Sequence, residues 1–322
     1  MIFGSVFASS AARAGSALAF AVASACAHSA AAPSPAAASA RPGAELWIGG
    51  DVFLGAGGHG ALAGIPSIVG GAPGIVNLEG PVGDGAGRSG GATAPPIRLI
   101  HAPRALAELR AAGIAVAGIA NNHARDAGPD GGAATARALA AVGVQAAGGP
   151  AGAALLPLGG LRVVVTAHDL EAGVPATLRA ELDAARRGGD VLIATFHVTG
   201  PPTYLPRPEL LEAVAIALEA GASVIAAHGS HELARVERRG RAVIAWGLGN
   251  LAFACACTDE QSGALLVVAL GPDGARTASI VPIDAGLSGA AARTAADPAL
   301  TYELLEALGA TRLERRGDRA RF

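Results

Sequence analysis

Residues able to bind metals follow one predicted strand after another along the chain. Each is a carboxylate, an amide or an imidazole, and each stands where a short apolar run ends. The set comprises Asp51, Glu79, Asn122 with His123, His197, His228 and His231. In layered α/β sheets, ligands bind beyond the carboxyl ends of the strands. These ligand types hold Mn, Zn or Fe, so we expect one shared site for one or two divalent metal ions.

Most of these residues have an ordinary structural interpretation when considered alone. Asp51 could belong to a turn, Glu79 could be a surface charge, and His197 could be a hydrogen-bonded imidazole in the core. His228 and His231 are harder to explain separately, because two imidazoles three residues apart on a loop can share one ion. For the other histidines of the domain we expect surface positions or roles supporting the site: these are His59, His101 and His168.

The elements that must position these residues alternate between short apolar runs and Ala/Leu-rich stretches, which predicts a layered α/β domain. We expect strands at 46–48, 74–78, 114–119, near 144, 161–166, 191–196, 223–227, 264–270 and 277–282, and a hairpin over 236–246. We expect helices at 103–112, 132–142, 175–187, 209–220 and 300–308, with a frayed Arg-rich end. The glycine-rich loop 83–91 lacks the Gly-Lys-Ser/Thr ending of a phosphate-binding loop.

The N-terminal segment has the composition of an export signal and a tether. Arg13 precedes an apolar stretch at 16–25, which is the length of a signal-peptide core and too short to span a bilayer. Small residues before Cys26 resemble a bacterial lipobox, which predicts a lipid anchor in the cell envelope. Plain cleavage to a periplasmic or secreted protein, or a cytoplasmic chain with a fortuitous apolar stretch, are the alternatives.

These features divide the chain into four segments. We expect a signal peptide at 1–25, an Ala/Pro/Ser-rich tether at 26–45, one folded domain at 46–285, and a C-terminal helix and tail at 286–322.

Composition argues against a nucleic-acid partner. The 322 residues carry 24 basic and 26 acidic side chains, a net charge of −2, and 3% aromatic residues. Nucleic-acid binders need a concentrated basic face and, for single strands, aromatic stacking platforms. Three cysteines cannot form a disulfide framework. A disulfide between Cys255 and Cys257, two residues apart, would be strained, so we expect small buried side chains, metal ligands, or an intermolecular or other redox role.

Several segments, taken together, resemble the CapA family of bacterial capsule and poly-γ-glutamate synthesis proteins, over about residues 46–270. The similar segments are Gly50-Asp51-Val-Phe-Leu-Gly55, Asn77-Leu-Glu79-Gly80-Pro-Val82, Ala120-Asn121-Asn122-His123 with Asp126 and Gly128, the His228-Gly-Ser-His231 loop after Gly221-Ala222, and Trp246-Gly-Leu-Gly249-Asn250-Leu-Ala-Phe253. The family is similar in fold to the calcineurin-like metallophosphoesterases. The resemblance therefore implies a single-domain, four-layer α/β/β/α sandwich with a metal site at the strand ends.

The resemblance also implies roles for individual residues. The implied metal ligands are Asp51, Glu79, Asn122, His197, His228 and His231, and His123 is the implied catalytic histidine. Asp126 could orient His123 or could cap a helix. The sequence departs from the phosphoesterase pattern at Phe53, where a ligand histidine is usual, and after His197, where a tryptophan and a glutamate are missing. Ser230 replaces an expected proline.

Two functions are consistent with this pattern. The first is a divalent-metal phosphoesterase-type hydrolase of capsule or poly-γ-glutamate synthesis, acting on a phosphoester or on an anionic polymer. The second is a non-catalytic, membrane-tethered assembly or export factor that uses the metal for binding or stability. An exported scaffold with an empty site is a third interpretation. The implied partners are the membrane, through Cys26, and other capsule-synthesis proteins.

Overall fold

The computed structural model describes residues 44–57, 59–85, 87–89, 97–200, 204–255, 261–287, 289–309 and 311–322. These residues belong to one compact unit, Arg41–Phe322. The predicted signal peptide, Cys26 and residues 27–43 of the predicted tether lie outside the described residues. The last two residues assigned to the tether, Ala44 and Glu45, belong instead to the first strand, where they pair with Leu270 and Ala269. Among the helices that the structure describes, none combines the length and the hydropathy needed to span a bilayer.

The first sheet is built around β1 (Ala44–Phe53). β1 runs parallel to β2 (Gly74–Leu78), and its first half pairs with the antiparallel β14 (Ser262–Gly271). The second half of β1 pairs instead with β13 (Asn250–Phe253). The sheet continues through β5 (Ile114–Gly118), β6 (Gln145–Ala147), β15 (Gly274–Asp284), β16 (Gly286–Leu287), β17 (Arg293–Thr294), β18 (Glu314–Arg316) and β19 (Arg319–Arg321).

The second sheet has the order β11-β12-β10-β9-β8-β7, and its central strands are parallel. Its strands are β7 (Ala154–Leu158), β8 (Leu161–Asp169), β9 (Val191–His197), β10 (Val224–His228), β11 (Val236–Arg239) and β12 (Ala242–Ala245). The strands β3 (Gly87–Ser89) and β4 (Arg98–Ile100) form a separate two-stranded ribbon.

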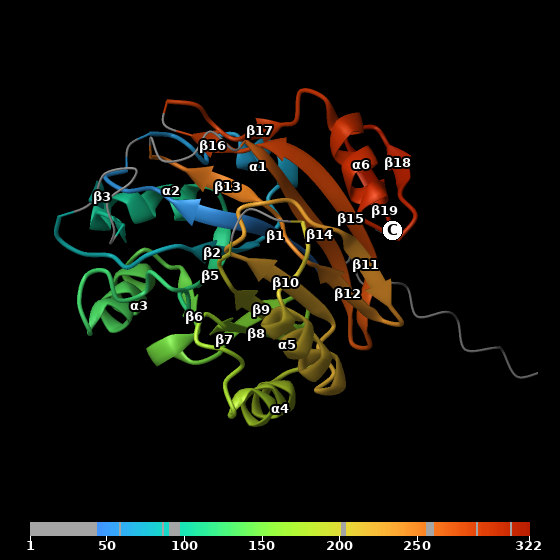
Figure 1. Cartoon of the computed structure of the whole chain (residues 1–322), viewed down its shortest axis with the longest axis horizontal. Coiled ribbons are helices and arrows are strands. Elements are labelled where there is room, and N and C mark those ends of the chain that lie inside the picture. Colours follow the sequence, from blue (N-terminus) through green and yellow to red (C-terminus); the bar gives the residue numbers. More distant parts are fainter. Residues whose placement is uncertain are drawn as a thin grey trace, which may run out of the picture. The chain divides into compact units, whose positions relative to one another are not determined.

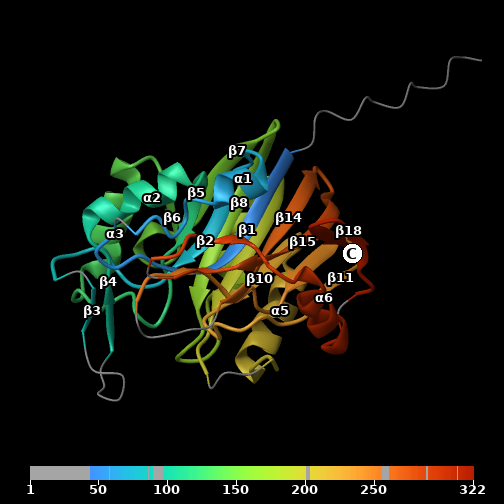
Figure 2. The same cartoon turned by 90° about the horizontal axis from the view of Figure 1, so that it is seen from above.

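Helices cover the outer face of each sheet (Figures 1 and 2). The first sheet carries α1 (Ile65–Val69), η1 (Pro103–Ala105), α2 (Leu106–Ala111) and α3 (Gly131–Ala141), with η2 (Gly149–Ala151) following β6. The second sheet carries α4 (Leu178–Gly188) and α5 (Pro208–Glu219). The last helix, α6 (Pro298–Ala307), contacts β15.

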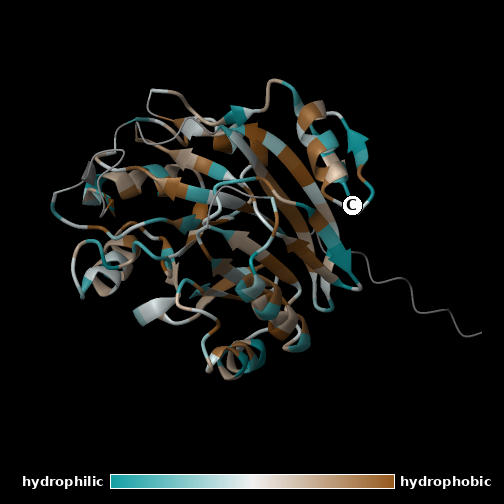
Figure 3. Cartoon of the chain, in the orientation of Figure 1, coloured by the Kyte–Doolittle hydropathy of each residue, from teal (hydrophilic) through white to brown (hydrophobic). Residues whose placement is uncertain are grey.

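Alternation along the strands produces the layers, because successive side chains of a strand point to opposite faces. Leu46 and Ile48 of β1 enter the core between the two sheets, whereas Trp47 packs under the helices of the first sheet. Figure 3 shows the brown, hydrophobic ribbon concentrated along the strands. The predicted four-layer α/β/β/α arrangement is therefore confirmed.

The C-terminal segment differs from expectation. We expected the Arg-rich end to fray, but β19 pairs with β15 at Ser279 and Ile280. Ala320 of β19 is fully buried in the core between the sheets. Ala320, flanked by arginines, and the half-buried Phe322, whose N–H donates to the Ala278 carbonyl oxygen, hold the end of the chain against the first sheet.

Candidate metal centre

Asp51 lies on β1 at the edge where the two sheets meet. Its Oδ1 accepts a hydrogen bond from Asn77 Nδ2 (2.8 Å), and its Oδ2 accepts one from the backbone N–H of Gly229 (3.0 Å). Burial alone would raise the pKa of Asp51, but the hydrogen bond and charge of His231, with the neighbouring histidines, hold it well below its usual value. Gly50 is required beside it, because a Cβ there would lie 1.9 Å from the Gly249 carbonyl oxygen.

Glu79 follows β2 directly and is as buried as Asp51. Burial raises the pKa of Glu79 to about 8, opposed by the charge of His231 and reinforced by Asp51. The backbone carbonyl of Glu79 is held by His101, whose Nε2 lies 3.0 Å from that oxygen. His101 Nδ1 accepts from the backbone N–H of Leu54 (3.3 Å), and burial lowers the pKa of His101 to about 4. Of the two roles expected for His101, the structure shows the supporting one.

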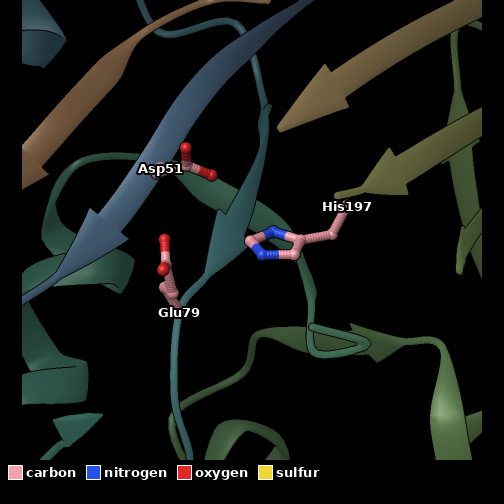
Figure 4. Close-up of side chains that lie close together, drawn as sticks. All are labelled: Asp51, Glu79 and His197. Carbon is pink, nitrogen blue, oxygen red and sulfur yellow. The ribbon is translucent and has the colours of Figure 1, made fainter. Parts of the chain in front are cut away.

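His197 ends β9 of the second sheet and points across to the first. Its Nε2 lies 3.0 Å from Asn122 Oδ1, and its Nδ1 lies 3.2 Å from Asn77 Nδ2. Burial lowers the pKa of His197 to about 3. Ligand atoms of Asp51, Glu79 and His197 all lie within 4.8 Å of one another, a grouping that could hold a metal ion (Figure 4).

The two histidines of the loop after β10 approach the same carboxylates. His228 Nδ1 lies 3.7 Å from Asp51 Oδ1, and burial lowers the pKa of His228 despite that charge. His231 lies between the two carboxylates, with Nδ1 at 3.3 Å from Asp51 Oδ2 and Nε2 at 3.6 Å from Glu79 Oε1. Burial would lower the pKa of His231, but Glu79 and Asp51 raise it to about 10.

Asn122 and His123 diverge, as their adjacent positions predict. Asn122 contacts His197, whereas His123 turns toward Glu79, with Nε2 at 4.0 Å from Oε1. His123 Nδ1 donates to Asp126 Oδ2 at 2.7 Å, and the same oxygen accepts from the backbone N–H of Leu99 at 2.6 Å. Asp126 therefore orients His123. The residue at the N-cap position of α3 is Asp130, whose side chain makes no capping hydrogen bond.

Three asparagines complete the cluster without having been assigned a role from the sequence. Asn77 links Asp51 to His197, and Asn121 Nδ2 donates to Asn77 Oδ1 (3.2 Å). Asn250 Oδ1 accepts from His231 Nδ1 (3.0 Å). Asn77 and Asn250 pair in register with Asp51 on its two sides. Their presence in the Asn-Leu-Glu and Gly-Asn segments was the available signal.

Phe53 occupies the position where the phosphoesterase pattern has a histidine. It is fully buried, and its ring lies 5.1 Å from that of His101 and 5.6 Å from that of Phe253. An apolar contact therefore replaces one imidazole. His59 is exposed, and His168 pairs with Glu181 at 3.4 Å, outside the cluster. Cys255 is disulfide-bonded, which removes it as a thiolate ligand.

The sandwich and the cluster at its carboxyl edge define a metallophosphatase-like α/β protein with a candidate metal site. Residues 68–254, more than half of the chain, match the family model for the bacterial capsule synthesis protein PGA_cap, and the chain belongs to this family. This match confirms the resemblance inferred from the motifs, and it includes every candidate ligand except Asp51.

The fold is also similar to a solved structure. The crystal structure of a hypothetical protein from Thermus thermophilus aligns with a TM-score of 0.53 and 14% identity, over 75% of this chain and 99% of that one. At this identity the likeness concerns the fold. No curated protein matches the sequence.

Proposed function

We propose that this capsule-synthesis protein binds at least one divalent metal ion and hydrolyses a phosphoester at the Asp51 cluster. The observation that carries the proposal is a pair of buried polar atoms. Glu79 Oε2 and His228 Nδ1 have no hydrogen-bond partner among the described residues. Each unsatisfied buried polar atom costs roughly 1–3 kcal/mol. Both of these atoms belong to residues that lie beside Asp51, so the site is suited to a ligand that satisfies both.

The donor set fits a divalent cation. The carboxylates of Asp51 and Glu79 and the imidazoles of His197, His228 and His231 converge. Asn122 contacts this group through its side-chain oxygen, which lies 3.0 Å from His197 Nε2. These are the oxygen and nitrogen donors that suit Mn, Zn or Fe. Asn77 and Asn250 fix the orientation of Asp51, His197 and His231, and such supporting hydrogen bonds tune metal ligands.

The residues of the chain divide the chemistry among them. A bound divalent ion would supply a more acidic water and would stabilise negative charge on phosphoryl oxygens. Asp51, Glu79, His197, His228 and His231 would hold the ion. His123 is 17% exposed and is oriented through Nδ1 by Asp126. Its Nε2 can therefore deliver a proton to the leaving oxygen at the mouth of the cluster.

The experiment is an activity screen on the purified full chain loaded in turn with Mn, Zn or Fe. The substrates are a phosphomonoester, a phosphodiester and poly-γ-glutamate. We expect metal-dependent release of product from a phosphoester, and its loss in Asp51→Asn. The matched control is His59→Gln, because His59 is exposed outside the cluster. Turnover of equal size in Asp51→Asn, or turnover that persists without metal, contradicts the proposal.

A second candidate is a non-catalytic assembly or export factor that uses the metal for stability or for binding polymer carboxylates. The apolar contact of Phe53 with Phe253 favours it, because a ligand position is committed to packing. In that case the loaded protein binds metal and gains stability, yet it releases no product from any of the three substrates.

We also propose export to the cell envelope. The apolar stretch at 16–25, the small residues before Cys26 and the Ala/Pro/Ser-rich segment support it. The lipid anchor at Cys26 would bring the metal centre to the outside of the cell, where capsule polymer accumulates.

A further inference from the structure

A second hollow lies at the opposite end of the sandwich from the metal centre. It has a volume of about 610 Å³, and its lining includes Arg186, Arg239, Arg241, Ser223 and Asp273. Three arginines against one aspartate give this lining a net positive charge, whereas the chain as a whole carries −2. The lining of this hollow is thus more positive than the chain as a whole.

The arginines differ in how far they are neutralised. Arg186 is half-buried, and its Nη1 donates to the Gly189 carbonyl oxygen (2.9 Å). Hydrogen bonds from Arg162, and to a smaller extent the charge of Arg186, lower the pKa of the Asp190 carboxyl. Arg239 is paired with Glu237 at 2.8 Å and lies over the Trp246 ring, so its charge is largely neutralised within and beside the β11–β12 hairpin. Arg241 meets Asp273 at 3.5 Å, but both side chains are more than 70% exposed, and such a pair contributes little. Arg276 adds a further exposed guanidinium, with Nε placed over Gly271, the residue before Pro272 of the lining.

The chain enters the domain at this same end. Ala44, the first residue of β1, pairs with Leu270, and Pro272 and Asp273 follow in the β14–β15 turn that lines the hollow. Asp51 stands seven residues further along β1, about 23 Å away at the strand rise of roughly 3.3 Å per residue. Ala44, the first described residue, therefore lies at the end of the sandwich that carries the arginines and away from the metal centre.

We infer that the end of the sandwich formed by Arg186, Arg241 and Arg276 docks on an anionic lipid surface. Each arginine within a Debye length of such a surface adds about 1 kcal/mol of attraction, which is about fivefold in binding. Docking in this orientation places the metal centre on the side of the domain that faces away from the lipid, where a polymer in solution can reach it.

The test is co-sedimentation of the full chain with phosphatidylcholine vesicles, with and without phosphatidylglycerol. The double variant Arg241→Gln/Arg276→Gln should bind the anionic vesicles about 25-fold more weakly than wild type. The matched control is Arg104→Gln/Arg137→Gln, which removes the same charge from exposed positions outside the hollow and should bind like wild type. The apolar stretch at 16–25 is present in wild type and in both double variants. Differences in vesicle binding among these proteins are therefore due to the substituted arginines.

A gain-of-binding variant keeps the test independent of folding defects. Asp273→Asn removes the negative charge from the lining, and its binding to anionic vesicles should increase about fivefold. The inference is overturned if the two double variants weaken equally, if Asp273→Asn binds no more tightly, or if phosphatidylglycerol makes no difference. It is also overturned if inorganic phosphate at low concentration abolishes vesicle binding at constant ionic strength, because the hollow would then be a site for the free anion.

Discussion

His231 contacts Asp51 across the junction of the two sheets, with Nδ1 at 3.3 Å from Oδ2. Asp51 belongs to β1 of the first sheet, and His231 to the loop after β10 of the second. The Gly229 N–H and the Asn77–His197 contact cross the same junction. The candidate metal centre is therefore also a polar connection that joins the two halves of the sandwich at their carboxyl edges.

Replacing His231 should loosen this connection in the metal-free protein. His231 has φ 59°, a left-handed conformation that asparagine tolerates, so His231→Asn removes the charge without adding backbone strain. We expect unfolding in urea, with a chelator present, to require about 1–2 kcal/mol less free energy at neutral pH. This value is discounted from that of a fully buried pair because the side chain is 34% exposed.

The pH dependence of that difference has a defined sign. The pKa of His231 is raised from 6.5 to about 10, so the contribution of its charge is complete below pH 6.5 and is lost as the pH rises through about 10. The difference in the free energy of unfolding between wild type and His231→Asn should therefore become smaller between pH 6.5 and about 10. A gap that is absent at neutral pH, or constant up to pH 10, would show that the charge of His231 does not stabilise the apo fold.

His101 should make the fold sensitive to acid. Its pKa falls from 6.5 to about 4 because it is buried, so the unfolded chain takes up its proton first as the pH drops. We expect wild type to lose up to about 3 kcal/mol of stability between pH 6.5 and 4 from this residue. The free energy of unfolding, measured by urea titration at each pH, should fall less steeply with decreasing pH in His101→Gln than in wild type. The control His59→Gln should show the same pH dependence as wild type. Parallel slopes for wild type and His101→Gln would contradict the assignment.

The layers were predictable from the sequence because they follow from local patterns. Short apolar runs marked β1, β2, β5, β8, β9 and β10, and polar residues after all of these runs except that of β8 marked the carboxyl edge. The short elements α1, β3, β4, β7 and β13, and the strands from β16 onward, were not predicted. Five residues or fewer, with a proline in both α1 and β7, give too little periodicity.

The supporting residues of the site were harder to predict for a different reason. Asn77 and Asn250 act on Asp51 through strand register, and register is set by pairing between distant segments. His101 contacts the backbone of Glu79 rather than a side chain, so its residue type carried no specific signal. The fraying expected at the C-terminus was wrong because burial of Ala320 depends on the position of β15.

His123 and Asp126 provide the test of catalysis within the proposed function. His123→Ala should lower phosphoester turnover roughly 10²–10⁴-fold while metal content stays at the wild-type level. Asp126→Asn has a side chain of nearly the same shape but weakens the hydrogen bond to His123 Nδ1. The loss of turnover should therefore be smaller than in His123→Ala, and the pH dependence of turnover should shift. If His123→Ala retains full activity, the histidine has no part in proton transfer.

Cys26 provides the test of the proposed anchor. Cell fractionation of wild type should recover the protein with membranes, and Cys26→Ser should shift it to the soluble envelope fraction. The matched control is Ser39→Ala, which changes a small residue of the Ala/Pro/Ser-rich segment, keeps all three cysteines and should remain with membranes. Wild type found wholly in the soluble fraction would reject the anchor.

Metal content of the purified full chain is the most direct test of the account, because every proposed role of the cluster depends on a bound ion. After loading with Mn, Zn or Fe and extensive dialysis, wild type and His59→Gln should each retain at least one ion per chain. Asp51→Asn and His228→Ala should retain markedly less, and their melting temperatures should no longer rise with added metal. Wild type without bound metal after loading, or equal retention in Asp51→Asn and wild type, would contradict the account.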